Sequence, residues 1–187
     1  ARQGDDLEPP SLRQHHAVVR SLEHIATSSG VRWSVLVHHS AQRTPLLSVD
    51  ADHVCATASV GKVLLLIAAA ELMECGDIDA KALLSRSDAD PVADSGLWQH
   101  LDVDRLSVSD LCTFIGATSD NLATNVLLHQ VGLPAVRSRT EDLGLLRTAL
   151  LDLVRDSRGP DDAPQLSVGS TAELTWLFAS LARGEIV

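Results

Sequence analysis

Apolar residues recur at helical spacing near the start of the chain and then give way to a two-residue alternation. Residues 11–27 predict an amphipathic helix with Ser11 as its N-cap. Its apolar stripe comprises Leu12, Val18, Val19, Leu22 and Ile25. Residues 31–37 alternate and predict a strand, and residues 46–49 predict a second strand after a turn at Pro45. The chain is therefore expected to open with a helix and a hairpin.

From residue 57 onward the pattern predicts helices and no further strands. Residues 59–74 are apolar on nearly every side, which is typical of a buried helix. Ser107 with Asp110, and Ser170 with Glu173, have the spacing of capping boxes at two later helix starts. The later predicted helices are 107–115, 121–131, 134–143 and 170–183, with a loop over 154–169.

Length and charge narrow the possible functions. The chain has 187 residues, of which 45% are hydrophobic and 21% charged, as expected for one packed domain. A net charge of −10 argues against nucleic acid or an anionic membrane surface as a partner, because phosphate groups would be repelled. The longest apolar run, 63–70, is too short to span a membrane. The sequence starts without a signal peptide, which leaves open a cytoplasmic location or export followed by trimming.

Cysteine and histidine do not predict a metal centre. Cys55, Cys75 and Cys112 lack the spacing of metal ligands, and their odd number leaves at least one free thiol. Two pairs of adjacent histidines, 15–16 and 38–39, would point to different faces of a helix or strand. We therefore expect neither a metal ion nor a cofactor.

The tetrapeptide Ser59-Val60-Gly61-Lys62 is the first candidate for chemistry. Lysine occurs in the chain only at positions 62 and 81. Residues three apart share a helix face, so the Lys62 amine can reach the Ser59 hydroxyl. A serine needs a base to become a good nucleophile, and a desolvated lysine can act as one. The alternative is an ordinary solvated helix start.

Ser119-Asp120-Asn121 lies between two predicted helices and, taken alone, would serve as a helix cap. Ser119 follows Ser59 by sixty positions. With both motifs in this order, the chain resembles the class A β-lactamases and the related penicillin-recognising serine hydrolases over residues 11–187. The resemblance implies an α+β, two-lobed fold. Residues 1–56 would supply a helix and two strands to an incomplete antiparallel-sheet lobe, and residues 57–187 would form an all-helical lobe. The family's C-terminal helix and last strands are missing from the sequence given.

The resemblance also implies roles for individual residues. Ser59 would attack the carbonyl of a β-lactam or related amide, with its own backbone N–H as one oxyanion donor. Lys62 would accept the serine proton, and Ser119 would pass a proton to the leaving nitrogen. Asn121 would bind the substrate amide and Lys62. Trp98 lies where the family often places an aromatic residue that lines the pocket, with ordinary packing as its alternative.

Two departures from the family qualify the expected function. No Lys-Thr-Gly occurs, so we expect the missing C-terminal segment to be needed in cis or in trans. Ungapped counting places Arg155 where the family has its deacylating glutamate, with Asp156 beside it as the candidate substitute. The chain is therefore interpreted as a serine hydrolase of the β-lactamase type acting on a small molecule. The alternatives are a non-hydrolysing penicillin-binding relative that traps the acyl group, and a helical interaction domain with chance motifs.

Overall fold

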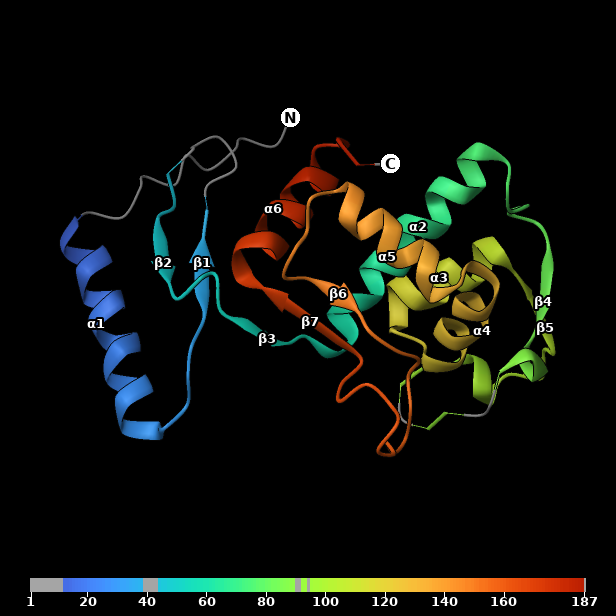
Figure 1. Ribbon diagram of the computed structural model, residues 1–187, viewed down its shortest axis with the longest axis horizontal. Coiled ribbons are helices and arrows are strands. Elements are labelled where there is room, and N and C mark those ends of the chain that lie inside the picture. The colour runs from blue at the N-terminus through green and yellow to red at the C-terminus, as the bar shows by residue number, and fades with distance from the viewer. Residues whose placement is uncertain (1–11, 39–43, 90–91, 94, 187) are drawn as a thin grey trace.

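The N-terminal helix and hairpin lie at one end of the molecule (Figure 1). The computed structural model describes residues 12–38, 44–89, 92–93 and 95–186, so the cap predicted at Ser11 lies outside the described residues. The three elements are helix α1 (Leu12–Ser29) and the antiparallel strands β1 (Val35–Val37) and β2 (Leu47–Val49). Helix α1 contacts β2, and β1 contacts the last helix, α6 (Thr171–Ala182). These elements confirm the predicted opening.

Helix α2 (Lys62–Cys75) runs through the centre of the remaining part of the molecule (Figure 1). Its apolar side chains enter the core on several sides, because neighbouring elements surround the helix. The helix ends at Gly76, whose φ of +81° places it in the left-handed region that glycine adopts without strain. The helices packed against it are α3 (Val108–Thr118), α4 (Asn121–Val131) and α5 (Leu133–Asp142).

The expectation that only helices follow residue 57 is wrong. In the described part of the chain, four strands lie beyond that position. Each is two to four residues long, too short for an alternating pattern to be recognised. The strands not yet described are β3 (Val54–Ala56), β4 (Leu83–Ser85), β5 (Arg105–Ser107), β6 (Ala149–Leu150) and β7 (Ser167–Ser170). Strand β7 lies between β3 and β6, and β4 pairs with β5. The division into lobes at residue 56 stays a prediction.

The two predicted capping boxes differ in outcome. Ser107 and Asp110 form the reciprocal box at the start of α3, as predicted, but that helix passes Gly116 and ends at Thr118. Ser170 caps α6 by accepting the Glu173 N–H. Among the described residues, the Glu173 carboxylate does not accept the Ser170 N–H, the second bond of a capping box. It instead accepts the backbone N–H groups of Leu146 and Arg147, in the turn before β6. Among the described residues, no helix has both the length and the apolarity required to cross a membrane.

Candidate active site

Ser59 lies on a short 3-10 turn, Ala58–Gly61, that leads directly into α2. The α-helix was expected to begin at Ser59, but it begins at Lys62. Ala58 has a φ of +45°, a conformation that costs a residue with a side chain strain energy. This local geometry leaves the Ser59 side chain exposed at the start of a buried helix.

Lys62 brings the two motifs together. Its side chain is buried, with 2% of the residue exposed. Its Nζ donates to Ser119 O at 2.7 Å, to Ser119 Oγ at 3.1 Å and to Asn121 Oδ1 at 2.7 Å. Three acceptors match the three hydrogens of an ammonium group. Among the described residues, no hydrogen bond joins the Ser59 hydroxyl to this group, so proton transfer from Ser59 requires Lys62 to release one of these contacts.

Burial lowers the pKa of Lys62 from its ordinary value to about 8, while the negative charge of Asp120 acts in the opposite direction. Desolvation disfavours the charged amine, and a nearby carboxylate favours it. With a pKa of about 8, roughly a tenth of the Lys62 amine is neutral at pH 7, and only this neutral form can act as a general base. The electrostatics therefore suit Lys62 to proton transfer with a neighbouring hydroxyl.

Asp120 anchors the second motif to the loop that follows residue 92. Its carboxylate is 1% exposed and accepts the backbone N–H groups of Leu97, Trp98 and Ala123. Gly96 packs so closely on this carboxylate that an added side chain would overlap it. Sequence reasoning treated Asp120 only as a helix cap. Its second function, holding the loop, could not be inferred because the loop contributes only backbone groups.

Asn121 has hydrogen-bond partners on both sides of its amide. Its oxygen accepts from Lys62, and its Nδ2 donates to Ala93 O at 3.0 Å. Its backbone N–H donates to Ser95 O. With the described residues Nδ2 makes this one hydrogen bond, and its second hydrogen is compatible with the substrate-binding role expected for Asn121.

Trp98 packs in the core. It is fully buried, its indole N–H donates to Val103 O, and its ring belongs to the hydrophobic core. The backbone N–H groups of Trp98 and Leu97 both donate to Asp120. These contacts favour the packing alternative, and a role of Trp98 in substrate binding stays a prediction.

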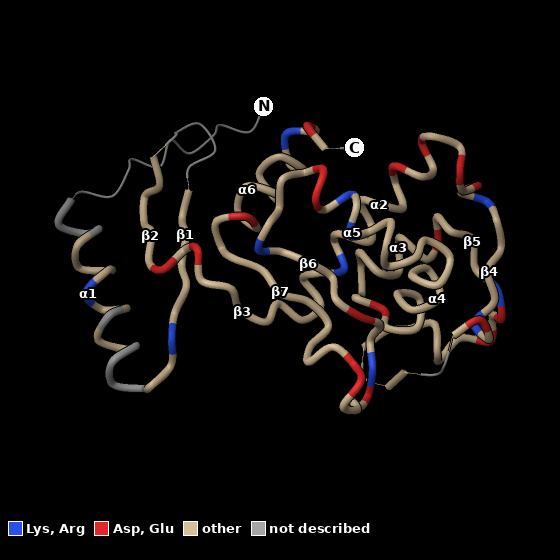
Figure 2. The backbone as a smooth tube through the Cα atoms, viewed as in Figure 1, with Lys and Arg blue, Asp and Glu red and all other residues tan. Residues whose placement is uncertain are grey.

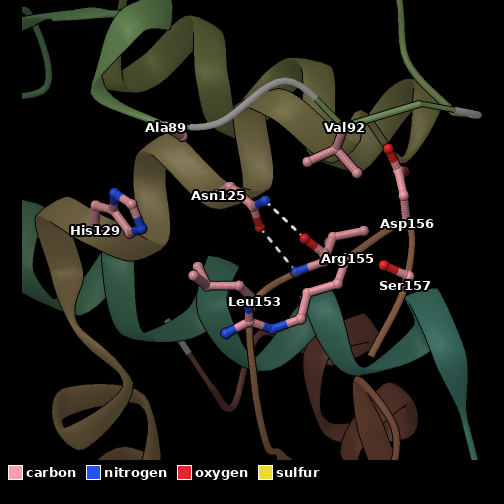
Figure 3. Close-up of a pocket in the computed structure, with 9 residues that line it drawn as sticks. Ala89, Val92, Asn125, His129, Leu153, Arg155, Asp156 and Ser157 are labelled. Atoms are coloured by element: carbon pink, nitrogen blue, oxygen red, sulfur yellow. Dashed lines mark hydrogen bonds between the residues drawn. The ribbon is translucent and has the colours of Figure 1, made fainter. Parts of the chain in front are cut away.

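Asp156 contacts Ala93, the residue whose carbonyl also accepts a hydrogen bond from Asn121 Nδ2. Its carboxylate accepts the Ala93 N–H at 2.9 Å, and the residue lines a cavity of about 200 Å³ (Figure 3). Asn125 also lines this cavity. Its side-chain amide donates to Val154 O and accepts the Val154 N–H, each at 2.8 Å, as the dashed lines show. Among the described residues, no hydrogen bond connects Asp156 with the Ser59 turn. Its role in deacylation stays a prediction.

A charge network holds the loop between β6 and β7. Asp152 accepts hydrogen bonds from Arg155 at 2.8 Å and from Arg158 at 2.6 Å, and Arg155 also pairs with Asp162. Figure 2 shows the acidic and basic positions of this loop side by side. Burial raises the pKa of Asp152, but the hydrogen bonds from both arginines and from Leu153 outweigh this and place the pKa below its ordinary value. Arg155 therefore stabilises the loop.

We expect Asp152→Asn to loosen this loop without unfolding the rest of the protein. Removing the charge takes the carboxylate partner from the half-buried Arg158 guanidinium, at a cost of about 1–3 kcal/mol, while exposed Arg155 keeps its ion pair with Asp162. Because the folded pKa is lowered, the stabilisation is present above the unfolded carboxyl pKa of about 4 and is lost as the pH falls through the folded value. Denaturant unfolding and proteolysis at 151–166 measure the effect. Asp161→Asn, an exposed change in the same loop, is the control and should change neither.

The structure gives no support for a metal centre in the residues that it describes. No group of three or more histidine, cysteine, aspartate or glutamate residues there is arranged to hold an ion. Cys55, Cys75 and Cys112 are all free thiols.

The comparisons with known proteins show the family and the fold. A model of the beta-lactamase enzyme family matches residues 17–187. No curated protein matches the chain. A beta-lactamase from Sphaerobacter thermophilus is 23% identical, with a TM-score of 0.75 over 92% of this chain and 64% of that one. A beta lactamase from Xanthomonas campestris is 18% identical, with a TM-score of 0.76 over 92% and 65%.

A third structure is described as an acyl-enzyme complex of a PBP-A mutant with penicillin G. It is 18% identical, with a TM-score of 0.73 over 94% of this chain and 64% of that one. Identities this low establish the fold alone, and that fold is the predicted α+β type. The chain spans slightly less than two thirds of the length of each of these three structures.

Proposed function

Because this chain belongs to the beta-lactamase enzyme family, we propose that Ser59 is acylated by a β-lactam or a related amide. The observation that carries the proposal is the set of hydrogen bonds from buried Lys62 to Ser119 and Asn121, next to the turn that presents Ser59. The structural neighbour described as a complex with penicillin G supports the choice of a lactam.

In the proposed reaction, Ser59 Oγ attacks the lactam carbonyl carbon while its proton moves to neutral Lys62. The negative charge that develops on the carbonyl oxygen is stabilised by the Ser59 N–H. The C–N bond then breaks, and a proton passes from Lys62 through the Ser119 hydroxyl to the leaving nitrogen. The product is an ester on Ser59 with an opened lactam ring. A second oxyanion donor from a Lys-Thr-Gly strand, supplied in cis or in trans, belongs to the proposal, and residues 1–187 do not contain that motif.

We further propose that release of the acyl group is slow. A general base is needed to activate water, and Arg155, at the position that sequence counting assigns to the family's glutamate, is a cation bound to Asp152. Asp156, the candidate substitute, accepts a backbone N–H of the neighbouring loop. These two observations favour the second candidate function, a penicillin-binding relative that holds the acyl group, over rapid hydrolysis.

Incubation of the full chain, with the segment that carries Lys-Thr-Gly supplied in cis or in trans, with a chromogenic lactam tests both proposals; the variants below are compared under the same condition. We expect intact-mass spectra to show one added lactam per chain, with peptide mapping to Ser59, and ring opening that stops near one equivalent. Continued turnover would reject slow release and retain the acyl-serine reaction. An adduct at another residue, or neither adduct nor ring opening, would reject the proposed function.

A further inference from the structure

Ser167, on strand β7, lies directly behind the turn that carries Ser59. The residue is fully buried (0% exposed). Its Oγ is 2.6 Å from Ala58 O and 2.7 Å from Thr57 Oγ1, and its backbone carbonyl accepts the Thr57 N–H at 3.1 Å. One residue, more than one hundred positions away in the sequence, therefore contacts the turn through both its side chain and its backbone.

The directions of these hydrogen bonds are fixed by chemistry. A carbonyl oxygen only accepts, so the single hydroxyl proton of Ser167 is directed at Ala58 O. Ser167 Oγ must then accept from Thr57, which donates its own hydroxyl proton. The result is a chain of two hydrogen bonds that ends on the Ala58 carbonyl. Successive bonds of this kind polarise one another inside a protein.

The Ala58 carbonyl belongs to the same peptide unit as the Ser59 N–H. A trans peptide is planar, so its C=O and N–H point in opposite directions. A hydrogen bond to Ala58 O therefore fixes the direction of the Ser59 N–H and increases its partial positive charge. The positive φ of Ala58 gives this peptide little support from local backbone preference, so an external contact is needed to define its plane.

Gly61 completes the contact between the turn and β7. Its α-carbon lies so close to the Ser167 side chain that an added Cβ would overlap Ser167 Cβ. Because Ser167 Cβ is bonded directly to the backbone of β7, it cannot rotate away. The close approach keeps the Ser167 hydroxyl at bonding distance from Ala58.

We propose that Ser167 is a positioning residue that orients and polarises the Ser59 N–H, the donor that stabilises the developing oxyanion. The inference rests on the proposed acylation of Ser59. It adds a specific role for Ser167, whose hydroxyl acts through Ala58 and whose side chain is closed off from solvent.

Ser167→Ala in the full chain is the test. We expect the acylation rate constant to fall roughly tenfold to a hundredfold, less than when an oxyanion donor is removed outright. The concentration of lactam that gives half the maximal rate should change little, because initial binding does not depend on the oxyanion. In isotope-edited infrared spectra, the ester carbonyl of acyl-Ser59 should move to higher wavenumber, because its hydrogen bond is weaker.

Ser170→Ala is the matched control. Ser170 lies on the same strand, is equally buried, and bonds to α6, with no hydrogen bond to the Ser59 turn. Its loss destabilises the protein through the missing helix cap, and acylation rate and ester frequency should stay at wild-type values. Thr57→Val is a second variant in case Ser167→Ala fails to fold. It removes the first donor of the hydrogen-bond chain and should shift both readouts in the same direction by a smaller amount.

Several outcomes would overturn the inference separately from the proposed function. If the wild type is acylated on Ser59 and Ser167→Ala matches it in rate and ester frequency, the role of Ser167 is wrong and the acyl-serine proposal stands. If the wild type takes up no lactam, the proposed function fails. Backbone NMR tests independently whether Ser167 orients the peptide between Ala58 and Ser59. The Ala58 carbonyl carbon and Ser59 amide nitrogen should shift in Ser167→Ala, and unchanged shifts would reject that role.

Discussion

Ser59→Ala should abolish covalent uptake of a lactam by the full chain. Removal of the hydroxyl leaves no atom that can form the ester, and loss of the nucleophile in serine hydrolases of comparable design lowers the rate on the order of a million-fold. Because Ser59 is exposed on a surface turn, the change creates no cavity, and the free energy of unfolding should stay within about 0.5 kcal/mol of wild type. Intact-mass spectrometry after incubation with a chromogenic lactam measures the result.

Ser109→Ala is the matched control for this change. Ser109 is also exposed and lies in the first turn of α3, and we expect its alanine variant to be acylated at the wild-type rate. A Ser59→Ala protein that still gains one lactam per chain, or still opens the ring, would show that another residue is the nucleophile. That result would reject the proposed mechanism and leave the fold unaffected.

The sequence predicted long elements better than short ones. Helix α4 was predicted with the bounds observed, because its apolar positions and the Gly132 that follows are local signals. Strand β7 was not predicted, because its pairing with β3 and β6 depends on residues far away in the chain. Residues 59–61 of the Ala58–Gly61 turn were predicted as the start of the α-helix for the same reason. Its conformation is held by Ser167, and no pattern within residues 57–62 encodes that contact.

The contacts of Lys62 were only partly predicted. The family resemblance implied its contact with Asn121, which the structure shows at 2.7 Å. Helix spacing predicted that Lys62 reaches Ser59, but its amine instead donates to Ser119, a contact that was not predicted. The sequence left open whether Trp98 lines a pocket or packs in the core, because its surroundings include a loop whose backbone N–H groups bond to Asp120. The sequence showed that Arg155 stands where the family has its deacylating glutamate. Its ion pairs with Asp152 and Asp162 were not predicted, because they form only in the folded loop.

Lys62→Met should lower the rate of acylation by roughly a thousandfold to ten-thousandfold, at the upper end of what general-base catalysis contributes. Methionine has similar length, so it fills the buried space without offering a basic nitrogen that could accept the serine proton. In the wild type, the rate should rise with pH as Lys62 loses its proton and level off above a pKa of about 8. The direction follows because only the neutral amine accepts the serine proton. The variant should lack this rise between pH 6 and 9.

Because the pKa of Lys62 is lowered in the folded state, Lys62→Met should lose activity while it stays folded. A lysine whose folded pKa lies below its unfolded value of about 10.4 costs folding free energy at neutral pH, because the buried ammonium is disfavoured. Lys62→Met removes that cost, which offsets the loss of three hydrogen bonds, so loss of activity should occur without loss of fold. Lys81→Met, at the other lysine and exposed, should match the wild type in both rate and pH profile. A wild-type rate that is flat from pH 6 to 9, or a Lys62→Met protein that keeps the rise, would exclude Lys62 as the base.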